Sequence, residues 1–201
     1  MTDEFITSAE KLASVRNELE KQGLDGMLLT RADRFQGEEV RGQDEYLAWL
    51  TGFTGSAGIA LILADRAVVA TDSRYTVQIK QQVDAALYQT YDTAVQSLAA
   101  WMAACPGKAE VKIGFDSWSV TCAGRKNLPT VLGEADVVWQ PVSAHPVAAV
   151  WADRHASPQT DIFTVDEGYA GHSGEVKINQ AAEQLKDSQL DFRFISAPDV
   201  M

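Results

Sequence analysis

Apolar residues recur at helical spacing near the start of the chain. Leu12, Val15 and Leu19 are three and four positions apart, which predicts a helix that buries one stripe of side chains. Thr7 and Glu10 occupy the two polar positions of a capping box, so the helix is expected to begin directly after Thr7. The chain is therefore expected to open with an amphipathic helix.

Short apolar runs between polar or turn-forming residues predict five strands. Only residues 64–66 separate the second run from the third, and so short a connection predicts a β-hairpin. The five runs are Met27–Leu29, Ile59–Leu63, Ala67–Ala70, Val111–Phe115 and Ala135–Trp139.

Further helices are predicted between these strands, over Tyr75–Val83 and Thr93–Ala104. Residues Asp116–Leu132 are expected to be partly helical until Pro129 interrupts them. Alternating helices and strands predict an α/β fold, a mixed β-sheet flanked by helices. Because it contains a hairpin, the sheet is not purely parallel.

A polar stretch, residues 31–45, follows the first predicted strand. It contains Gly37 and Gly42 and lacks apolar periodicity. Segments of this length inside a compact domain are commonly either functional or mobile. Because solvated runs of charge are common, we interpret this one as a mobile, solvent-exposed loop.

The end of the chain repeats its beginning. Leu24-Asp25 recurs 166 positions later as Leu190-Asp191, and the same shift carries the helical stripe onto Ile178, Ala181 and Leu185. Two units of one design are the simplest interpretation, and a chance match of a common helix–strand order is the alternative. We expect one domain over residues 1–158, then a linker and the truncated start of a second similar domain over residues 159–201. With its sheet incomplete, the second unit is expected to dock on the first domain or to be poorly ordered over residues 173–201.

The composition excludes some classes of binding partner and indicates where in the cell the protein is located. The chain has 28 acidic and 17 basic residues, a formal charge of −11, which argues against nucleic acid and anionic membrane surfaces as partners. No apolar run approaches the ~20 residues of a membrane span, and the first residues lack the pattern of a signal peptide. We therefore expect a cytoplasmic protein. Cys105 and Cys122 are expected to be buried thiols.

The sequence lacks the common catalytic motifs. Gly52, Gly55 and Gly58 match neither the phosphate-binding loop nor the dinucleotide fingerprint, because a predicted strand follows them instead of a helix. No zinc-ligand or nucleophile pattern occurs. The histidines His145, His155 and His172 are expected in exposed loops. We therefore predict no catalytic residue and no metal ligand in this chain.

Arg74 is the one candidate binding residue. It follows the second strand of the predicted hairpin, within Thr71–Tyr75, where polar side chains collect. One interpretation is an ion pair with Asp72 or an ordinary helix-surface arginine. The other is a cation that contacts a carboxylate or carbonyl group of a ligand.

Four segments together resemble aminopeptidase P, the Xaa-Pro aminopeptidase family, in its longer three-domain form. The pairing of the glycine-rich segment with the Thr-Asp-x-Arg-Tyr motif after a hairpin is the most specific part of the likeness. The segments are Asp44–Ala48, Gly52–Gly58, Thr71–Tyr75 and Val150–Arg154.

The resemblance implies a creatinase/prolidase-like N-terminal α/β domain whose catalytic partner lies elsewhere. Family members carry a dinuclear metal site, usually manganese, in a C-terminal domain, so no cofactor is expected in these 201 residues. The implied partners are that catalytic domain, a second copy in a homodimer, and a peptide substrate. Arg74 matches the arginine that lies near the substrate cleft in the family, and Ser73 replaces a frequent glycine.

Two alternatives stay open at this point. The chain could be a stand-alone binding module of the same fold, which recognises peptides or proteins without cleaving them. It could also belong to a creatinase-like amidinohydrolase, although the repeated second unit argues against that class, which has a single such domain.

Overall fold

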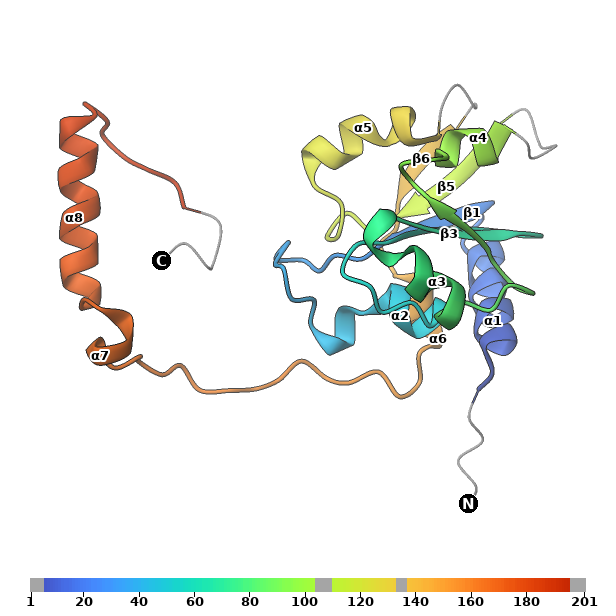
Figure 1. Cartoon of the computed structure of the whole chain (residues 1–201), viewed down its shortest axis with the longest axis horizontal. Coiled ribbons are helices and arrows are strands. Elements are labelled where there is room, and N and C mark those ends of the chain that lie inside the picture. The colour runs from blue at the N-terminus through green and yellow to red at the C-terminus, as the bar shows by residue number, and fades with distance from the viewer. Residues whose placement is uncertain (1–5, 104–109, 133–136, 196–201) are drawn as a thin grey trace, which may run out of the picture. The chain divides into compact units, whose positions relative to one another are not determined.

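The computed structural model describes residues 6–103, 110–132 and 137–195, and the chain divides into two compact units, residues 1–156 and 157–201. The first unit is a six-stranded β-sheet with helices on both faces (Figure 1). Its strands are β1 (Gly26–Thr30), β2 (Ile59–Leu63), β3 (Ala67–Thr71), β4 (Gln89–Asp92), β5 (Val111–Phe115) and β6 (Val137–Pro141). Its helices are α1 (Ser8–Lys21), α2 (Tyr46–Thr51), α3 (Thr76–Gln82), α4 (Leu98–Ala103), α5 (Cys122–Leu132) and α6 (Pro146–Val150), with 3₁₀ turns η1 (Gly42–Asp44) and η2 (Ser73–Tyr75).

The strand order β4-β3-β2-β1-β5-β6 confirms the mixed sheet. Strand β2 is antiparallel to both of its neighbours, β1 and β3, which confirms the predicted hairpin. All other neighbouring strands are parallel. The carboxyl ends of every strand except β2 therefore lie along one edge of the sheet.

Helix α1 begins as its sequence predicts. The Thr7 hydroxyl accepts a hydrogen bond from the Glu10 backbone N–H at 3.3 Å, and the Glu10 carboxylate accepts one from the Thr7 N–H at 2.7 Å. Leu12, Val15 and Leu19 are all buried. The capping box and the apolar stripe together place α1 against the sheet.

The sheet is buried on both faces because alternate side chains of its inner strands point in opposite directions. Met27 and Leu29 of β1 pack with α1, α2, α3 and α6, whereas Leu28 packs with α4 and α5. Figure 1 shows α4 and α5 on the opposite side of the sheet from α1, α2 and α6. The two apolar layers explain why β1, β2 and β3 are continuous apolar runs rather than alternating ones.

Near the sheet edge, one strand was not predicted and one predicted helix boundary is wrong. The sequence pattern missed β4, which within the described residues pairs with β3 alone and carries mostly polar side chains, so it has no apolar signal. Helix α4 begins at Leu98 rather than Thr93, because Asp92 first closes a turn by accepting the Ala94 N–H at 2.9 Å. Ala104 lies outside the described residues.

Helix α5 continues through Pro129 to Leu132, so the expected interruption at Pro129 is wrong. A proline inside a helix removes one hydrogen-bond donor and commonly kinks or breaks the helix, but here the backbone remains helical for three further residues. Cys122, at the start of α5, is an exposed free thiol rather than a buried one. Cys105 and Ala135, the predicted start of the last strand, lie outside the described residues.

The second unit contains helices α7 (Glu167–Ala170) and α8 (Gly174–Asp187). Helix α8 repeats α1 after 166 positions in length and in both ends: Ser173 caps it as Thr7 caps α1, and Gln189 adopts a positive φ as Gly23 does. The stripe expected to be buried is not, since α8 has no buried residue and Ile178 is 70% exposed. The same shift of 166 positions aligns residues 194–196 with the end of β1, but residues 194–195 form no strand, and Ser196 lies outside the described residues.

Among the residues that the structure describes, no helix combines the length and the apolar character that crossing a membrane requires.

Candidate functional site

The candidate site lies at the carboxyl edge of the sheet, where α/β proteins bind ligands in general. Arg74 directly follows the carboxyl end of β3, in η2. The glycine-rich segment, residues 52–58, leads into β2 and reaches the same edge, because β2 runs antiparallel to its neighbours. The Arg74 and glycine segments of the sequence therefore meet in space.

Arg74 forms an ion pair with Asp72, which is one of the two interpretations that the sequence left open. Its Nε and Nη2 atoms donate to the two carboxylate oxygens of Asp72 at 3.0 and 2.7 Å, and Asp72 also caps η2 by accepting the Arg74 N–H. The hydrogen bond from Arg74 lowers the pKa of Asp72, and Asp72 raises the pKa of Arg74. The Arg74 side chain is still 66% exposed, so one side of the guanidinium remains accessible to a ligand.

The glycine-rich segment holds Tyr75, the neighbour of Arg74. Ser56 Oγ and Tyr75 Oη are 2.6 Å apart in a hydrogen bond, and the Tyr75 ring meets the Phe53 ring edge-on with centroids 6.1 Å apart. A side chain at Gly55 would lie 2.3 Å from Phe53 Cζ, and Gly52 ends α2 with φ +79°. These two glycines thus serve close packing and a left-handed turn, not a phosphate.

The other two segments of the family resemblance, Asp44–Ala48 and Val150–Arg154, contact each other beside α2. Arg154 Nε donates to the Gln43 carbonyl at 2.7 Å, and its Nη2 lies 3.3 Å from Asp44 Oδ1. The Arg154 guanidinium also covers the Tyr46 ring at 5.0 Å, and Trp151 stacks on Trp49 with centroids 5.3 Å apart. The segments around Asp44 and Arg154 are therefore one packed unit, although they are more than a hundred residues apart.

The sequence did not single out Arg31. Its side chain connects the glycine-rich segment with the segment that begins at Asp44. Its Nη1 donates to the Ser56 carbonyl at 3.3 Å, and its Nη2 lies 3.1 Å from Glu45 Oε1. The Arg31 side chain is only 11% exposed, and burial raises the pKa of Glu45 despite the nearby cation. The one hint in the sequence was the position of its partner Glu45, which directly precedes the apolar run that becomes α2.

The interpretation of residues 31–45 as a solvent-exposed loop is wrong for several of its polar groups. Asp33, Gln43 and Asp44 are 3%, 5% and 6% exposed. The Asp33 carboxylate accepts the Phe35 N–H at 2.9 Å, which folds the loop into a turn. Charge alone could not reveal the burial of Gln43 and Asp44, because both contact Arg154, which lies far away in the sequence.

His145 also departs from its expected exposed loop, whereas His155 and His172 are exposed as expected. The His145 ring stacks on Tyr46 with centroids 3.8 Å apart, and its Nδ1 caps α6 by accepting the Val147 N–H at 3.2 Å. Burial, helped by the positive charge of Arg154, lowers the pKa of His145 to about 4. His145 is therefore a neutral packing residue near the site.

Within the described ranges, no three His, Cys, Asp or Glu side chains are grouped as metal ligands would be. The arrangement supplies an accessible cation, Arg74, on a rigid base of aromatic and charged contacts. Such a site can bind or orient a carboxylate or carbonyl group.

Arg154→Gln is expected to lower the free energy of unfolding by about 1–3 kcal/mol, because buried Asp44 loses a charged donor. Urea denaturation of the purified chain measures the change. As a control, the double variant Asp44→Asn/Arg154→Gln should lose less free energy of unfolding than the two single variants lose in total. Simple additivity would contradict a direct coupling of Asp44 with Arg154.

The chain belongs to the creatinase/prolidase N-terminal domain family, which it matches over residues 11–149. Among curated relatives, it is 27% identical over 183 residues to Xaa-Pro aminopeptidase 2 of Rattus norvegicus, an alignment that covers 90% of this chain and 27% of the relative. The chain thus spans little more than a quarter of that relative's length.

Solved structures share the fold. The X-prolyl aminopeptidase of Caenorhabditis elegans, described as a cytosolic enzyme with a di-nuclear active site, matches with a TM-score of 0.76 and 22% identity, over 92% of this chain and 32% of that one. The N-terminal domain of the cytoplasmic peptidase PepQ from Mycobacterium tuberculosis matches with a TM-score of 0.54 and 26% identity, over 70% of this chain and 97% of that one.

Proposed function

We propose that this chain is the non-catalytic N-terminal portion of a cytoplasmic Xaa-Pro aminopeptidase. The parent enzyme would release the N-terminal residue that precedes proline, by metal-assisted hydrolysis at a dinuclear manganese centre in a separate catalytic domain. This portion would shape the substrate cleft and help the enzyme to dimerise. Membership of the family and the names of the curated relatives support the proposal.

The observation that carries the proposal is the assembly around Arg74. Arg74 lies exposed at the carboxyl edge of the sheet, and its position depends on Tyr75, which Ser56 and Phe53 hold. Asp72 neutralises the cation only on one side, so Arg74 can still donate to a peptide carbonyl or carboxylate. We therefore assign Arg74 to substrate contact and name no catalytic residue in this chain.

The 201-residue chain with added manganese is expected not to hydrolyse a Xaa-Pro peptide. Release of the N-terminal residue above the rate of a buffer blank would overturn the non-catalytic role. Sedimentation velocity on the same sample tests dimerisation: a dimer supports a contribution of this portion to the interface, and a monomer at all concentrations contradicts it.

Arg74→Ala in the parent enzyme is expected to raise KM for a Xaa-Pro peptide about tenfold while kcat changes little, because a lost substrate contact removes binding energy. Arg66→Ala is the matched control. Arg66 also pairs with an adjacent aspartate, Asp65 at 2.8 Å, but it lies in the hairpin turn at the opposite edge of the sheet. Equal KM values for Arg74→Ala and Arg66→Ala would contradict the assignment.

A further inference from the structure

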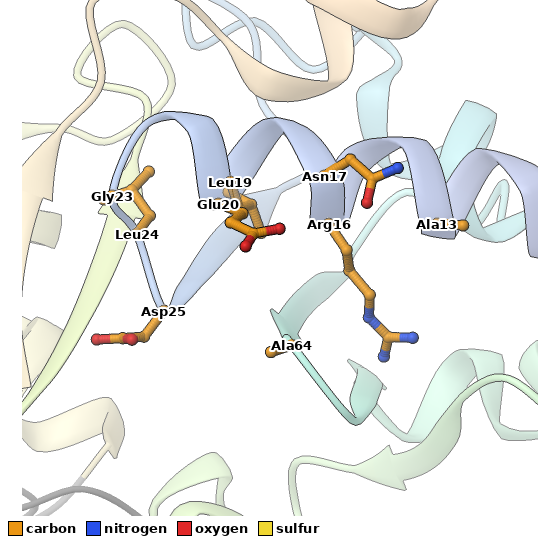
Figure 2. Close-up of a pocket in the computed structure, with 9 residues that line it drawn as sticks. All are labelled: Ala13, Arg16, Asn17, Leu19, Glu20, Gly23, Leu24, Asp25 and Ala64. Atoms are coloured by element: carbon orange, nitrogen blue, oxygen red, sulfur yellow. The ribbon is translucent and has the colours of Figure 1, made fainter.

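A surface hollow of about 650 Å³ opens beside α1, within the size range of small-molecule sites. We call it the α1 pocket; its walls include Arg16, Asn17 and Glu20 of α1 and Ala64 of the hairpin turn (Figure 2). Ala64 follows the carboxyl end of β2, which runs antiparallel to β3. The pocket is therefore at the opposite edge of the sheet from Arg74.

Arg16 is held in the pocket wall with donors to spare. Its Nε donates to the Leu63 carbonyl at 2.9 Å, which fixes the guanidinium, and Figure 2 shows the side chain extending from α1 toward Ala64. Within the described residues, its terminal amino groups have no hydrogen-bond partner. The nearby carboxylate of Asp65 is held by Arg66 instead, through contacts of 2.8 and 3.2 Å. The outer edge of the Arg16 guanidinium can thus donate two parallel hydrogen bonds to a carboxylate.

Glu20 lies one helical turn after Arg16 on the same face of α1. Its carboxylate is exposed and has no partner in the described part of the chain, and the Asn17 amide between them has none either. The one hydrogen bond of the Arg16 side chain within the described residues goes to the Leu63 carbonyl rather than to Glu20, and a cation that precedes an anion by four positions along a helix is the weaker order for an ion pair. The pocket wall therefore carries one cation, Arg16, and two carboxylates, Glu20 and Asp25, together with the apolar side chains of Leu19 and Leu24.

We propose that the α1 pocket binds a zwitterion of the free α-amino acid class. The ligand carboxylate would occupy the terminal amino groups of Arg16, and its ammonium group would face Glu20. An aliphatic side chain would lie over Leu24 and Ala64, which gives the pocket a preference for an apolar amino acid. Adjacent opposite charges favour a zwitterion over a simple anion, which the −11 charge of the chain repels.

The test titrates the 201-residue chain with L-leucine and follows backbone amide shifts by NMR. Saturable shifts are expected at residues 13–25, and N-acetyl-leucine and leucinamide, which each lack one charge, should bind more weakly. Arg16→Gln is expected to weaken leucine binding about ten- to hundredfold, because a charge-assisted pair is lost. Glu20→Gln should weaken leucine binding while leaving the affinity for N-acetyl-leucine unchanged.

Arg125→Gln is the matched control, since Arg125 lies over the Phe115 ring on the other face of the sheet and should not affect leucine binding. Thermal melts of each variant check folding. If Arg16→Gln fails to fold, Glu20→Gln decides, because the Glu20 carboxylate makes no contact whose loss could unfold α1. Absence of saturable shifts, equal binding of N-acetyl-leucine, or unchanged affinity in the folded variants would overturn the proposal.

Discussion

Phe53→Ala is expected to lower the free energy of unfolding by about 3–5 kcal/mol, the usual cost of removing a buried aromatic ring. Phe53 belongs to the glycine-rich segment, is 0% exposed and is part of the hydrophobic core. The close approach of Gly55 to Phe53 shows that the surrounding backbone is already tightly packed and cannot collapse into the space. Urea denaturation of the purified chain measures the loss.

Phe53→Ala should also loosen the segment that carries Arg74, because the Phe53 ring supports Tyr75. Phe35→Ala is the control, because Phe35 is 45% exposed and its main contact is Arg41 over its ring. It should cost less than about 1 kcal/mol, the usual value of an exposed cation–π contact. Similar losses for Phe53→Ala and Phe35→Ala would contradict the packing role of the glycine-rich segment.

His145→Asn is expected to reduce the pH dependence of stability between pH 6.5 and about 4. The folded chain holds His145 neutral down to about pH 4, whereas the unfolded chain binds a proton near the ordinary value of 6.5. The unfolded state thus binds more protons in this window, so His145 lowers stability as the pH falls, by about 3 kcal/mol in total. Asparagine keeps an acceptor for the α6 cap but does not titrate.

The measurement is the free energy of unfolding at several pH values for wild type and variant, since their difference removes the contribution of the carboxylates. His155→Asn is the matched control, because His155 is exposed and should leave the pH dependence unchanged. Parallel curves for wild type and His145→Asn would show that the folded environment of His145 does not disfavour its charge.

The candidate site was only partly accessible to sequence reasoning. The motif Thr71–Tyr75 pointed to Arg74 and to its pairing with Asp72, because both partners are close in sequence. Arg31 escaped notice, since its partners Glu45 and Ser56 are 14 and 25 positions away in the sequence. A charged side chain has no periodic signature, so nothing local distinguishes a buried arginine from a solvated one.

Local chemistry was sufficient to predict the apolar strands β1, β2 and β3 and the helix α1. The capping box at Thr7, the stripe of Leu12, Val15 and Leu19, and the apolar runs of β1, β2 and β3 depend on neighbours within a few residues. The repeat of α1 as α8 was visible for the same reason, since its caps and its length are local features. Strand β4 was not visible, because the backbone partners that make it a strand come from β3, its neighbour in the sheet.

Which polar groups are buried was decided by the tertiary structure and not by the local sequence. Asp44 and His145 look alike, as polar residues in loops, until Arg154 and Tyr46 are brought beside them. The same holds for the glycine-rich segment: its sequence identified the family, but only the packing of Phe53 and Tyr75 shows why the glycines are needed. Contacts between distant segments set the surroundings of a charge, and those surroundings decide whether it is solvated, paired or neutral.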